Sequence, residues 1–426
     1  MKRRKFIQQV GIVGSGAILA PGILKAVGKD NPTLLVVSGW QDVNIGDITH
    51  TPGLLHILET YIPHAKIILW KKSRGNINSE AVETLLNKNF PRVKVIYGNV
   101  DEDKNVSSKE LLDAFSVSDI MIHGSGPSVV GRVNLQAWYK NTGKPFGIFG
   151  TTIQHINPEL KTLLEKASFI YTRETKSLDV LKEAGINRNN SFAPDGTFFL
   201  NIHDEQTANK FLKDNNLEEK KFICAIPRLR ITPYYDFKPN HNYSDERIQF
   251  IEDLNERKKE WDHAKLREAM ITWVRETGNK VLVCPEMTYQ VEIMDELLID
   301  PLPDDVKPYV IKRGYWMPDV AASVYAKAHT VLSFECHSPI IAAANGTPFF
   351  YLRQPEDTIK GHMYYDLNFN DWIFEIEDTE GKQISDQLMK IWGNYSSAQQ
   401  YIKINMSKVA QIYSDSCDLI TTELKI

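Results

Sequence analysis

Short apolar runs alternate with segments of helical periodicity along most of the chain, and this alternation constrains the fold more than any other feature. The runs are rich in Val, Ile, Leu and Phe, as is typical of strands that are buried on both faces of a parallel sheet. The predicted strands are residues 34–38, 66–70, 93–97, 119–123, 146–149 and 169–172 in the first part of the chain, and 222–227, 280–284, 309–312, 330–334 and 349–352 in the second.

Amphipathic segments between these runs predict helices that connect the strands. One is expected at residues 51–61, because Thr51 is followed by Pro52 and proline is favoured at an early helical position. Residues 228–247 show little periodicity and predict a long loop, a kind of segment that is often functional. The fold class is therefore α/β with doubly wound (Rossmann-like) parallel sheets. The other predicted helices are residues 79–86, 109–115, 131–141, 174–184, 258–276, 289–298, 317–328 and 339–345.

A break in the alternation divides the chain into two such domains. Residues 201–221 are polar and contain only a short amphipathic segment, which predicts a linker. Open parallel sheets bind ligands at the carboxyl ends of their strands, so the two domains are expected to face a cleft whose pocket touches Asp47, Gly124 and His337. The expected units are an N-terminal domain at 31–200, a C-terminal domain at 222–380 and C-terminal helices at 381–426.

Residues 1–28 have the plan of an export signal. Four basic residues at positions 2–5 precede an apolar run rich in glycine and alanine, and the adjacent Arg3 and Arg4 resemble a twin-arginine signal. The run is short for a membrane span and is interrupted by glycines and by Pro21; an uncleaved anchor is the alternative. We therefore expect a periplasmic protein with no stable membrane span after signal removal.

Composition excludes two classes of site. The formal net charge of −4 lacks the electrostatic footprint of a nucleic-acid-binding protein. The four cysteines lie far apart without the paired spacing of a structural zinc site, and three of them lie in apolar runs, which indicates small buried side chains. The sequence predicts neither a metal nor a cofactor.

Polar residues follow the predicted strands of the N-terminal domain. Asn44, Gly46 and Asp47 form a tight turn before a helix, which suits binding of phosphate or carboxylate, although Asn44 and Asp47 also fit as turn caps. Arg173 is either an anion ligand or a salt-bridged scaffold residue. Asp195 either faces the cleft or serves the turn in which it lies.

A histidine and two glycines follow the predicted strand at 119–123. Gly124 and Gly126, with Ser125 between them, allow a ligand to approach the backbone closely. His123 is a candidate proton carrier because imidazole titrates near neutral pH. A structural, hydrogen-bonded histidine is the commoner role at such a position.

The C-terminal domain also has candidate binding residues after its predicted strands and in its predicted loop. Arg228 and Arg230 follow its first strand and are candidate ligands for a carboxylate or a phosphate. Glu286 follows the next strand. Tyr234 and Tyr235 lie in the predicted loop and are candidates for stacking on sugar rings.

The segment from Ser333 to His337 is the most informative, because it ends a strand and opens a helix. Glu335 and His337 are two residues apart and point the same way along an extended chain, so they are candidates for general acid–base catalysis. A nearby Glu335 carboxylate would raise the pKa of His337; alternatively Glu335 only caps the helix. Ser333 with His337 could also suggest a nucleophile and its base. However, Ser333 does not lie in the Gly-x-Ser-x-Gly turn that presents such a nucleophile.

Taken in order, these motifs resemble those of polysaccharide pyruvyl transferases. The resemblance covers about residues 36–352 and is closest in the C-terminal part. It rests on Asn44–Asp47, His123–Gly126, Gly147–Gly150, Arg173 with Ser177 and Gly185, Pro194 with Asp195, Ser333, His337, Ser338, Ile340 and Ala342, and the run Gly346–Pro348.

The resemblance implies a GT-B-like fold and a donor, phosphoenolpyruvate, whose pyruvyl group becomes a ketal on a sugar. It implies His337 as the acid and basic residues of the second domain as ligands of the donor. Two features depart from the family. Glu335 stands where arginine is common, which opposes binding of a trianionic donor. The export signal removes the protein from the cytoplasm, where phosphoenolpyruvate is available.

Three functions follow as hypotheses. The first is pyruvyl transfer to a polysaccharide or oligosaccharide. The second is an exported hydrolase or lyase that uses Glu335 with a second carboxylate from Asp195, Glu286 or Asp47. The third is a non-catalytic carbohydrate-binding protein whose tyrosines in the 228–247 loop stack on sugars.

Replacement of both Arg3 and Arg4 by lysine tests the export hypothesis. A twin-arginine receptor reads the arginine pair itself, so the variant should accumulate in the cytoplasm while the wild type reaches the periplasm. Cell fractionation followed by immunoblotting measures this. Unchanged periplasmic accumulation of the variant would contradict a twin-arginine route.

Overall fold

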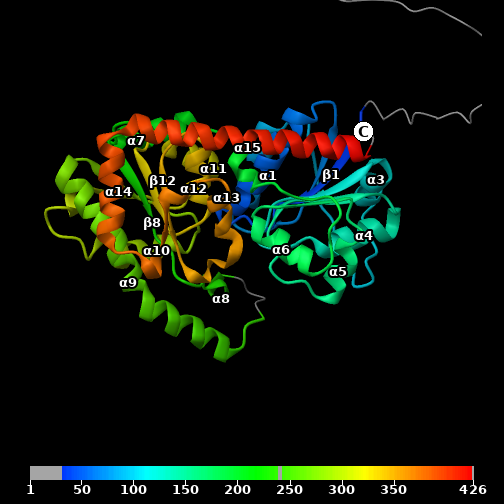
Figure 1. Cartoon of the computed structure of the whole chain (residues 1–426), viewed down its shortest axis with the longest axis horizontal. Coiled ribbons are helices and arrows are strands. Elements are labelled where there is room, and N and C mark those ends of the chain that lie inside the picture. Colours follow the sequence, from blue (N-terminus) through cyan, green and yellow to red (C-terminus); the bar gives the residue numbers. More distant parts are fainter. Residues whose placement is uncertain (1–30, 238–241, 425–426) are drawn as a thin grey trace, which may run out of the picture.

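The computed structural model describes residues 31–237 and 242–424, and the predicted export signal at residues 1–28 lies outside this part. Two parallel sheets covered by helices form two domains, as the alternation predicts (Figure 1). Every pairing between named strands is parallel.

The N-terminal domain contains a seven-stranded sheet in the order β3-β2-β1-β4-β5-β6-β7. Its strands are β1 (Thr33–Ser38), β2 (Lys66–Lys71), β3 (Lys94–Ile96), β4 (Ile120–His123), β5 (Phe146–Thr151), β6 (Phe169–Thr172) and β7 (Asn190–Phe192). Its helices are α1 (Ile45–Tyr61), α2 (Ser79–Asn89), α3 (Lys109–Val117), α4 (Arg132–Thr142), α5 (Pro158–Leu164) and α6 (Thr175–Glu183), followed by the 3₁₀ turn η1 (Gly196–Phe199).

The C-terminal domain contains a six-stranded sheet in the order β10-β9-β8-β11-β12-β13. Its strands are β8 (Phe222–Ile226), β9 (Lys280–Val283), β10 (Val310–Lys312), β11 (Thr330–Ser333), β12 (Phe349–Arg353) and β13 (Ile373–Glu375). Its helices include α8 (Tyr234–Phe237), α9 (Asp245–Thr277), α10 (Gln290–Met294), α11 (Pro318–Tyr325), α12 (His337–Ala344) and α13 (Met363–Asp366), and the 3₁₀ segment η4 (Pro355–His362) follows β12.

The central strands explain the continuous apolar runs of the sequence. All residues of β1 and β8 are buried, because helices cover both faces of each sheet. In each sheet the strand order reverses beside this first strand, since β1 lies between β2 and β4 and β8 lies between β9 and β11. Such reversals are where open α/β sheets bind ligands.

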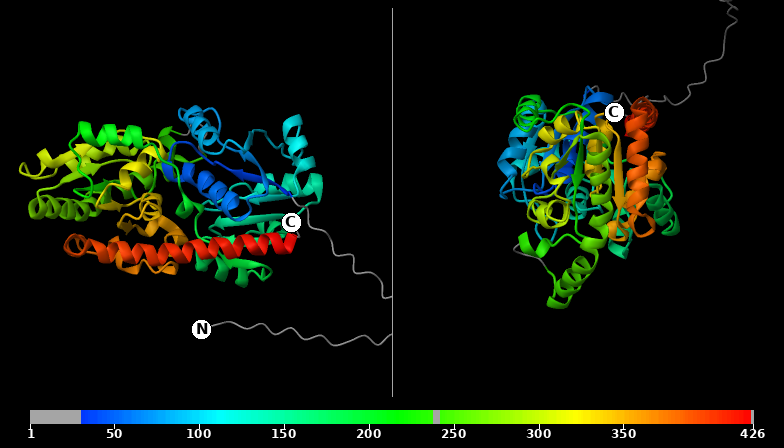
Figure 2. Two further views of the ribbon diagram at one scale, coloured as in Figure 1. Left: turned by 90° about the horizontal axis from the view of Figure 1, so that it is seen from above. Right: turned by 90° about the vertical axis from the view of Figure 1, so that its left-hand side faces the viewer.

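The C-terminal helices tie the two domains together. Helix α14 (Gly381–Gly393) packs on α9, and α15 (Tyr395–Leu424) then crosses from the second domain to the first (Figures 1 and 2). Tyr61 donates a hydrogen bond to the Ala410 carbonyl of α15 at 3.0 Å, and Tyr413 donates one to the Asp195 carbonyl at 2.6 Å. Among the described helices, none is long and apolar enough to span a membrane.

The prediction that the first helix begins at Thr51 is wrong. The Asn44 side chain accepts hydrogen bonds from the backbone N–H groups of Gly46 at 2.6 Å and Asp47 at 3.3 Å, so α1 begins at Ile45. An asparagine cap satisfies N–H groups that have no partner within the helix. Pro52, which suggested the later start, lies inside α1.

The segments predicted as a linker and as a long loop both contain helices. The predicted linker at 201–221 includes α7 (Glu205–Asp214), whose N-terminus is capped by the Asp204 carboxylate. The predicted loop at 228–247 includes α8, and α9 begins within it at Asp245, where the Ser244 hydroxyl caps the helix. The short strands β7 and β13 were not predicted, and both are only partly buried.

A glycine in α1 fixes the distance between this helix and the turn η1. A Cβ atom at Gly53 would lie 2.2 Å from the carbonyl oxygen of Gly196. We expect Gly53→Ala to lower the free energy of unfolding by about 1–3 kcal/mol, because overpacking forces the backbone to shift. Gly314→Ala is the control, since no atom lies within 4 Å of its added Cβ. Equal denaturant stability of the two variants would contradict the packing described here.

Candidate functional site

Two histidines and an aspartate meet where the two domains touch. His50 lies on α1, Asp195 follows β7, and His337 is the first residue of α12. The Nε2 atoms of His50 and His337 are 3.0 Å apart, and Asp195 Oδ2 lies 3.2 Å from the first and 4.0 Å from the second. His50 and Asp195 are fully buried, and His337 is 7% exposed. Each domain therefore contributes side chains to one buried cluster.

The start of α1 is built to admit the His337 ring. A Cβ atom at Gly46 would lie 2.3 Å from His337 Nδ1, so only glycine allows the imidazole to lie against the helix. The Asn44 cap begins the helix at Ile45, so Asp47 and His50 lie about one turn apart on the same face of α1. Asp47 Oδ1 lies 3.9 Å from His50 Nδ1.

Glu286, which follows β9, orients His337 from the second domain. Its Oε1 atom lies 3.1 Å from His337 Nδ1, and its Oε2 atom accepts hydrogen bonds from the Ser338 backbone N–H at 2.6 Å and hydroxyl at 2.8 Å. Burial raises the pKa of Glu286 to about 7, although the Ser338 hydrogen bonds oppose the rise. The contact holds the imidazole with Nδ1 toward the carboxylate and Nε2 toward His50.

Backbone hydrogen bonds close the interface beside this cluster. Ile45 N–H donates to the Glu286 carbonyl at 2.9 Å, and Thr288 N–H donates to the Val43 carbonyl at 3.1 Å. An isolated antiparallel bridge joins Asn44 to Met287 between them. The loops at the ends of β1 and β9 are thereby fixed to each other.

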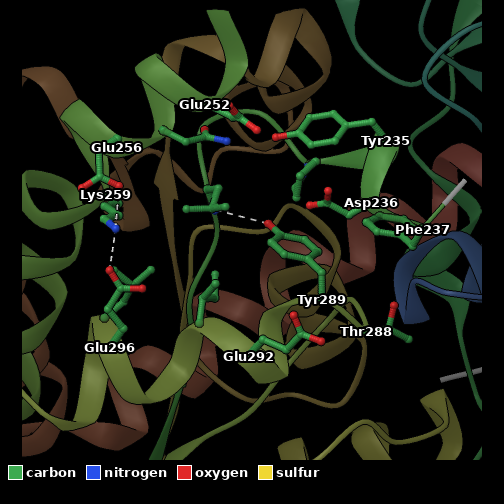
Figure 3. A pocket seen from close by; sticks show the side chains of 15 residues that line it. Tyr235, Asp236, Phe237, Glu252, Glu256, Lys259, Thr288, Tyr289, Glu292 and Glu296 are labelled. Atoms are coloured by element: carbon green, nitrogen blue, oxygen red, sulfur yellow. Dashed lines mark hydrogen bonds and ion pairs between the residues drawn. The ribbon is translucent and has the colours of Figure 1, made fainter. Parts of the chain in front are cut away.

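The sequence predicts that the largest pocket lies between the domains and touches Asp47, Gly124 and His337, but none of these three residues lines either of the two spaces described next. A pocket of about 460 Å³ lies instead within the second domain, beside α8 (Figure 3). Tyr235 and Tyr289 line it with several acidic side chains. A second space of about 530 Å³ lies near the carboxyl end of α12 and is lined by both domains and α15.

Arg173 supports Asp195 from the first domain. Its NH1 atom donates to Asp195 Oδ2 at 2.9 Å and its Nε atom donates to Thr152 Oγ1 at 2.7 Å, while its buried NH2 atom has no hydrogen-bond partner among the described residues. The Thr152 hydroxyl donates in turn to Glu174 Oε2 at 2.9 Å. Arg173 is thus salt-bridged, as one of the two roles predicted from the sequence requires. Its NH2 group has no hydrogen-bond partner among the described residues.

The expectation that Glu335 raises the pKa of His337 is wrong. Cys336 has helical backbone angles, so the chain turns between the two residues and the rule for an extended strand does not apply. Glu335 instead accepts a hydrogen bond from Gln290 at 2.7 Å and lies 3.4 Å from Arg228 Nε. Burial and the neighbouring His50 lower the pKa of His337 to about 3.

The two candidate arginines of the second domain are engaged with acids. Arg228 NH1 contacts the Asp357 carboxylate, and it also donates to Gln354 at 3.0 Å. Arg230 forms a two-bond pair with Asp262 at 2.5 and 2.6 Å. These pairs occupy donors that would otherwise be available to an anionic ligand.

The glycine-rich loop after β4 does not join the cluster, but it positions the turn that carries Asp195. His123 stacks on Trp40, and its Nε2 accepts the backbone N–H of Gly131 at 2.9 Å. Burial lowers its pKa to about 3, so it stays neutral, as expected of a structural histidine. The Ser125 hydroxyl accepts the Gly196 N–H at 3.0 Å and thereby positions the turn that carries Asp195.

The remaining candidates lie at the edges of the site. A Cβ at Gly124 would lie 2.9 Å from Ser38 Oγ, and Gly126 forms a bridge with Thr151, so these glycines permit close packing. The Ser333 hydroxyl bonds to the backbone of Glu335 and stabilises the turn after β11. Tyr234 and Tyr235 lie on α8, and Tyr235 lines the pocket of Figure 3.

His50 was missed from the sequence. The helix was expected to begin at Thr51, which left His50 in a loop with no periodicity to place it. The signal was Asn44 as an N-cap, because a helix that begins at Ile45 contains both Asp47 and His50 and places them on the same face. With His337 and Asp195 it forms a set whose ligand atoms all lie within 4.8 Å of one another, close enough to hold a metal ion.

Two doubly wound domains with a shared site define a GT-B-like fold, and solved structures of that class are similar to most of the chain. A glycosyltransferase from Rickettsia africae covers 93% of this chain and 100% of its own, with TM-score 0.57 and 12% identity. The S. aureus MnaA–UDP co-structure gives TM-score 0.55 at 11% identity, covering 92% and 96% of the two chains. UDP-GlcNAc 2-epimerase from Neisseria meningitidis gives 0.54 at 11%, covering 93% and 100%.

The family itself is given by a sequence model. The model for polysaccharide pyruvyl transferase matches residues 44–354, which is more than half of the chain. The protein therefore belongs to the polysaccharide pyruvyl transferase family, as the ordered motifs predicted, and the family is one of transferases. A search of curated proteins found no significant match.

Glu174 predicts a measurable pH dependence of stability. Burial raises its pKa from 4.5 to about 7, so its contribution to stability is complete below about pH 4.5 and is lost as pH rises through 7. Glu174→Gln should remove this decline, which amounts to as much as about 3 kcal/mol. Denaturant unfolding across this range measures the effect, with the exposed Glu183→Gln of the same helix as control. Identical pH profiles for wild type and Glu174→Gln would contradict the burial of this carboxyl group.

Proposed function

We propose that this protein transfers a pyruvyl group from phosphoenolpyruvate to a bacterial polysaccharide or oligosaccharide. The observation that carries the proposal is the family match, whose residues 44–354 include every member of the buried cluster. In this reaction two hydroxyl groups of a sugar add to the enol carbon of the donor and phosphate leaves. One hydroxyl proton goes to the methylene carbon and the other leaves with phosphate.

The arrangement around His337 supports proton transfer at this place. The Nδ1 atom of His337 contacts Glu286 of its own domain, and the other ring nitrogen, Nε2, faces His50 of the first domain. The site lies at the carboxyl ends of strands from both sheets, where a donor held by one domain meets an acceptor held by the other. The resemblance to the family assigns the acid role to this same histidine; because its pKa is lowered to about 3, it is neutral near pH 7 and must first accept the proton that it then donates.

Cations for the donor come from both domains. The NH2 group of Arg173 is buried and has no hydrogen-bond partner in the described chain, which suits a carboxylate. Lys360 lies on η4 with its Nζ atom 3.6 Å from Asp357 Oδ1, and its side chain is partly exposed. Arg228 contributes less, because Glu335 and Asp357 already neutralise it.

The acceptor is proposed to be a glycan. Two of the similar structures contain UDP or UDP-GlcNAc by their titles, which supports a sugar-related substrate for this fold. We also propose that the protein is exported; it would then meet its glycan outside the cytoplasm and would need a supply of phosphoenolpyruvate there. Nothing in the family match or the similar structures supports the alternative of a hydrolase, and Glu335 forms an ion pair with Arg228.

Incubation of the purified protein with phosphoenolpyruvate and a panel of bacterial glycans tests the proposal. We expect glycan-dependent release of phosphate and a pyruvyl ketal on the product by mass spectrometry. His337→Ala should reduce the rate by about 10²–10⁴-fold, since acid–base groups contribute this much. His56→Gln is the control, because His56 lies on α1 outside the cluster.

Two outcomes would contradict pyruvyl transfer. The first is the absence of phosphate release across the panel, and the second is hydrolysis of glycans that already carry pyruvyl ketals, which would favour the hydrolase. Full activity of a folded His337→Ala variant would contradict the role given to His337. Glycan affinity without any turnover would favour a carbohydrate-binding protein.

A further inference from the structure

We propose that His50, Asp195 and His337 bind a divalent transition-metal cation such as Zn²⁺ at the contact between the two domains. The three donors are two imidazole nitrogens and one carboxylate oxygen, a ligand set that binds zinc and related metals in proteins. Calcium and magnesium are disfavoured, since both prefer sites made of oxygen. The site requires both domains, because His50 and Asp195 come from one and His337 from the other.

The spacing of the donor atoms fits a shared cation. Zinc bonds of about 2.0–2.2 Å place neighbouring ligand atoms about 3.0–3.5 Å apart. The His50–His337 and His50–Asp195 separations of 3.0 and 3.2 Å fall in this range. The third separation, between His337 and Asp195, is 4.0 Å and reaches the range with a shift of about 0.5 Å.

The ring nitrogens that face away from the cluster have acidic neighbours. Glu286 lies 3.1 Å from His337 Nδ1, which fixes the proton there and leaves the Nε2 lone pair for a metal. His50 Nδ1 is buried, has no hydrogen-bond partner among the described residues, and lies 3.9 Å from Asp47. A carboxylate behind a metal-binding histidine fixes the tautomer and orients the ring, and Glu286 is placed to do this for His337, whereas Asp47 lies beyond hydrogen-bond distance of His50.

Charge balance favours a cation in spite of Arg173. Asp47, Asp195 and Glu286 lie around the two imidazoles, and Arg173 is the cation that contacts Asp195 directly. A carboxylate oxygen has two lone pairs, so Asp195 Oδ2 can accept the Arg173 hydrogen bond and still coordinate a metal. A divalent charge at the centre offsets acidic groups that are otherwise buried together.

Three protein ligands leave open coordination positions, as in catalytic rather than structural zinc sites. A water or a substrate oxygen can occupy such a position, and the cation lowers the pKa of a bound water. The metal site rests on geometry that is independent of the pyruvyl transfer proposed above, but a cation bound to His337 Nε2 would occupy the nitrogen that the proposed acid role uses. A protein that binds metal without turnover refutes only the transfer, and a protein that turns over without metal refutes only the site.

Metal analysis of the full chain tests the proposal. Protein stripped with a chelator and titrated with Zn²⁺ should bind one equivalent per chain by calorimetry, with a rise in Tm. His50→Gln should weaken binding by more than about 100-fold, beyond what loss of an outer hydrogen bond costs. Glu286→Gln, which removes such an outer contact, should weaken it by about 10–100-fold.

His56→Gln is the matched control on the same helix and should bind Zn²⁺ like the wild type. Circular dichroism of each variant separates loss of binding from loss of folding. Wild-type protein that takes up less than a stoichiometric amount of Zn²⁺, Mn²⁺, Co²⁺ and Fe²⁺ would overturn the proposal regardless of how the variants fold. Equal affinity of the His50→Gln and His56→Gln variants would overturn it as well.

Discussion

The contact between His50 of one domain and His337 of the other is the interaction on which the rest of the site depends. It buries two imidazoles against the Asp195 carboxylate, and each of these groups needs support, because burial of polar groups without partners is unfavourable. Arg173 supplies that support to Asp195, and Glu286 supplies it to His337. Arg173 and Glu286 therefore stabilise the buried cluster through direct contacts with Asp195 and His337.

The same contact sets the relative position of the domains. Gly46 has no side chain that would collide with His337. Backbone hydrogen bonds between the loops after β1 and β9 hold the start of α1 in place. Helix α15 adds a second connection, since Tyr413 reaches the carbonyl of Asp195. The two domains meet at the carboxyl ends of both sheets, where open α/β sheets bind ligands.

The sequence predicts the architecture well and the site only in part. Buried strands such as β1 and β8 are visible as apolar runs, whereas β7 and β13 are short and partly exposed and leave no such pattern. His337 and Asp195 follow from their places after strands. The partner of His337 could not be predicted, because Glu286 lies 51 residues away and meets it only through the fold.

The central claim is that both domains build one buried cluster of two imidazoles and a carboxylate. A crystal structure of the protein at neutral pH tests it most directly. The account predicts the Nε2 atoms of His50 and His337 facing each other beside Asp195, either in hydrogen-bond contact or sharing one peak of metal density, with the Ile45 N–H bonded to the Glu286 carbonyl. An open, water-filled cleft that separates the two imidazoles, with His50 pointing into its own domain, would contradict it.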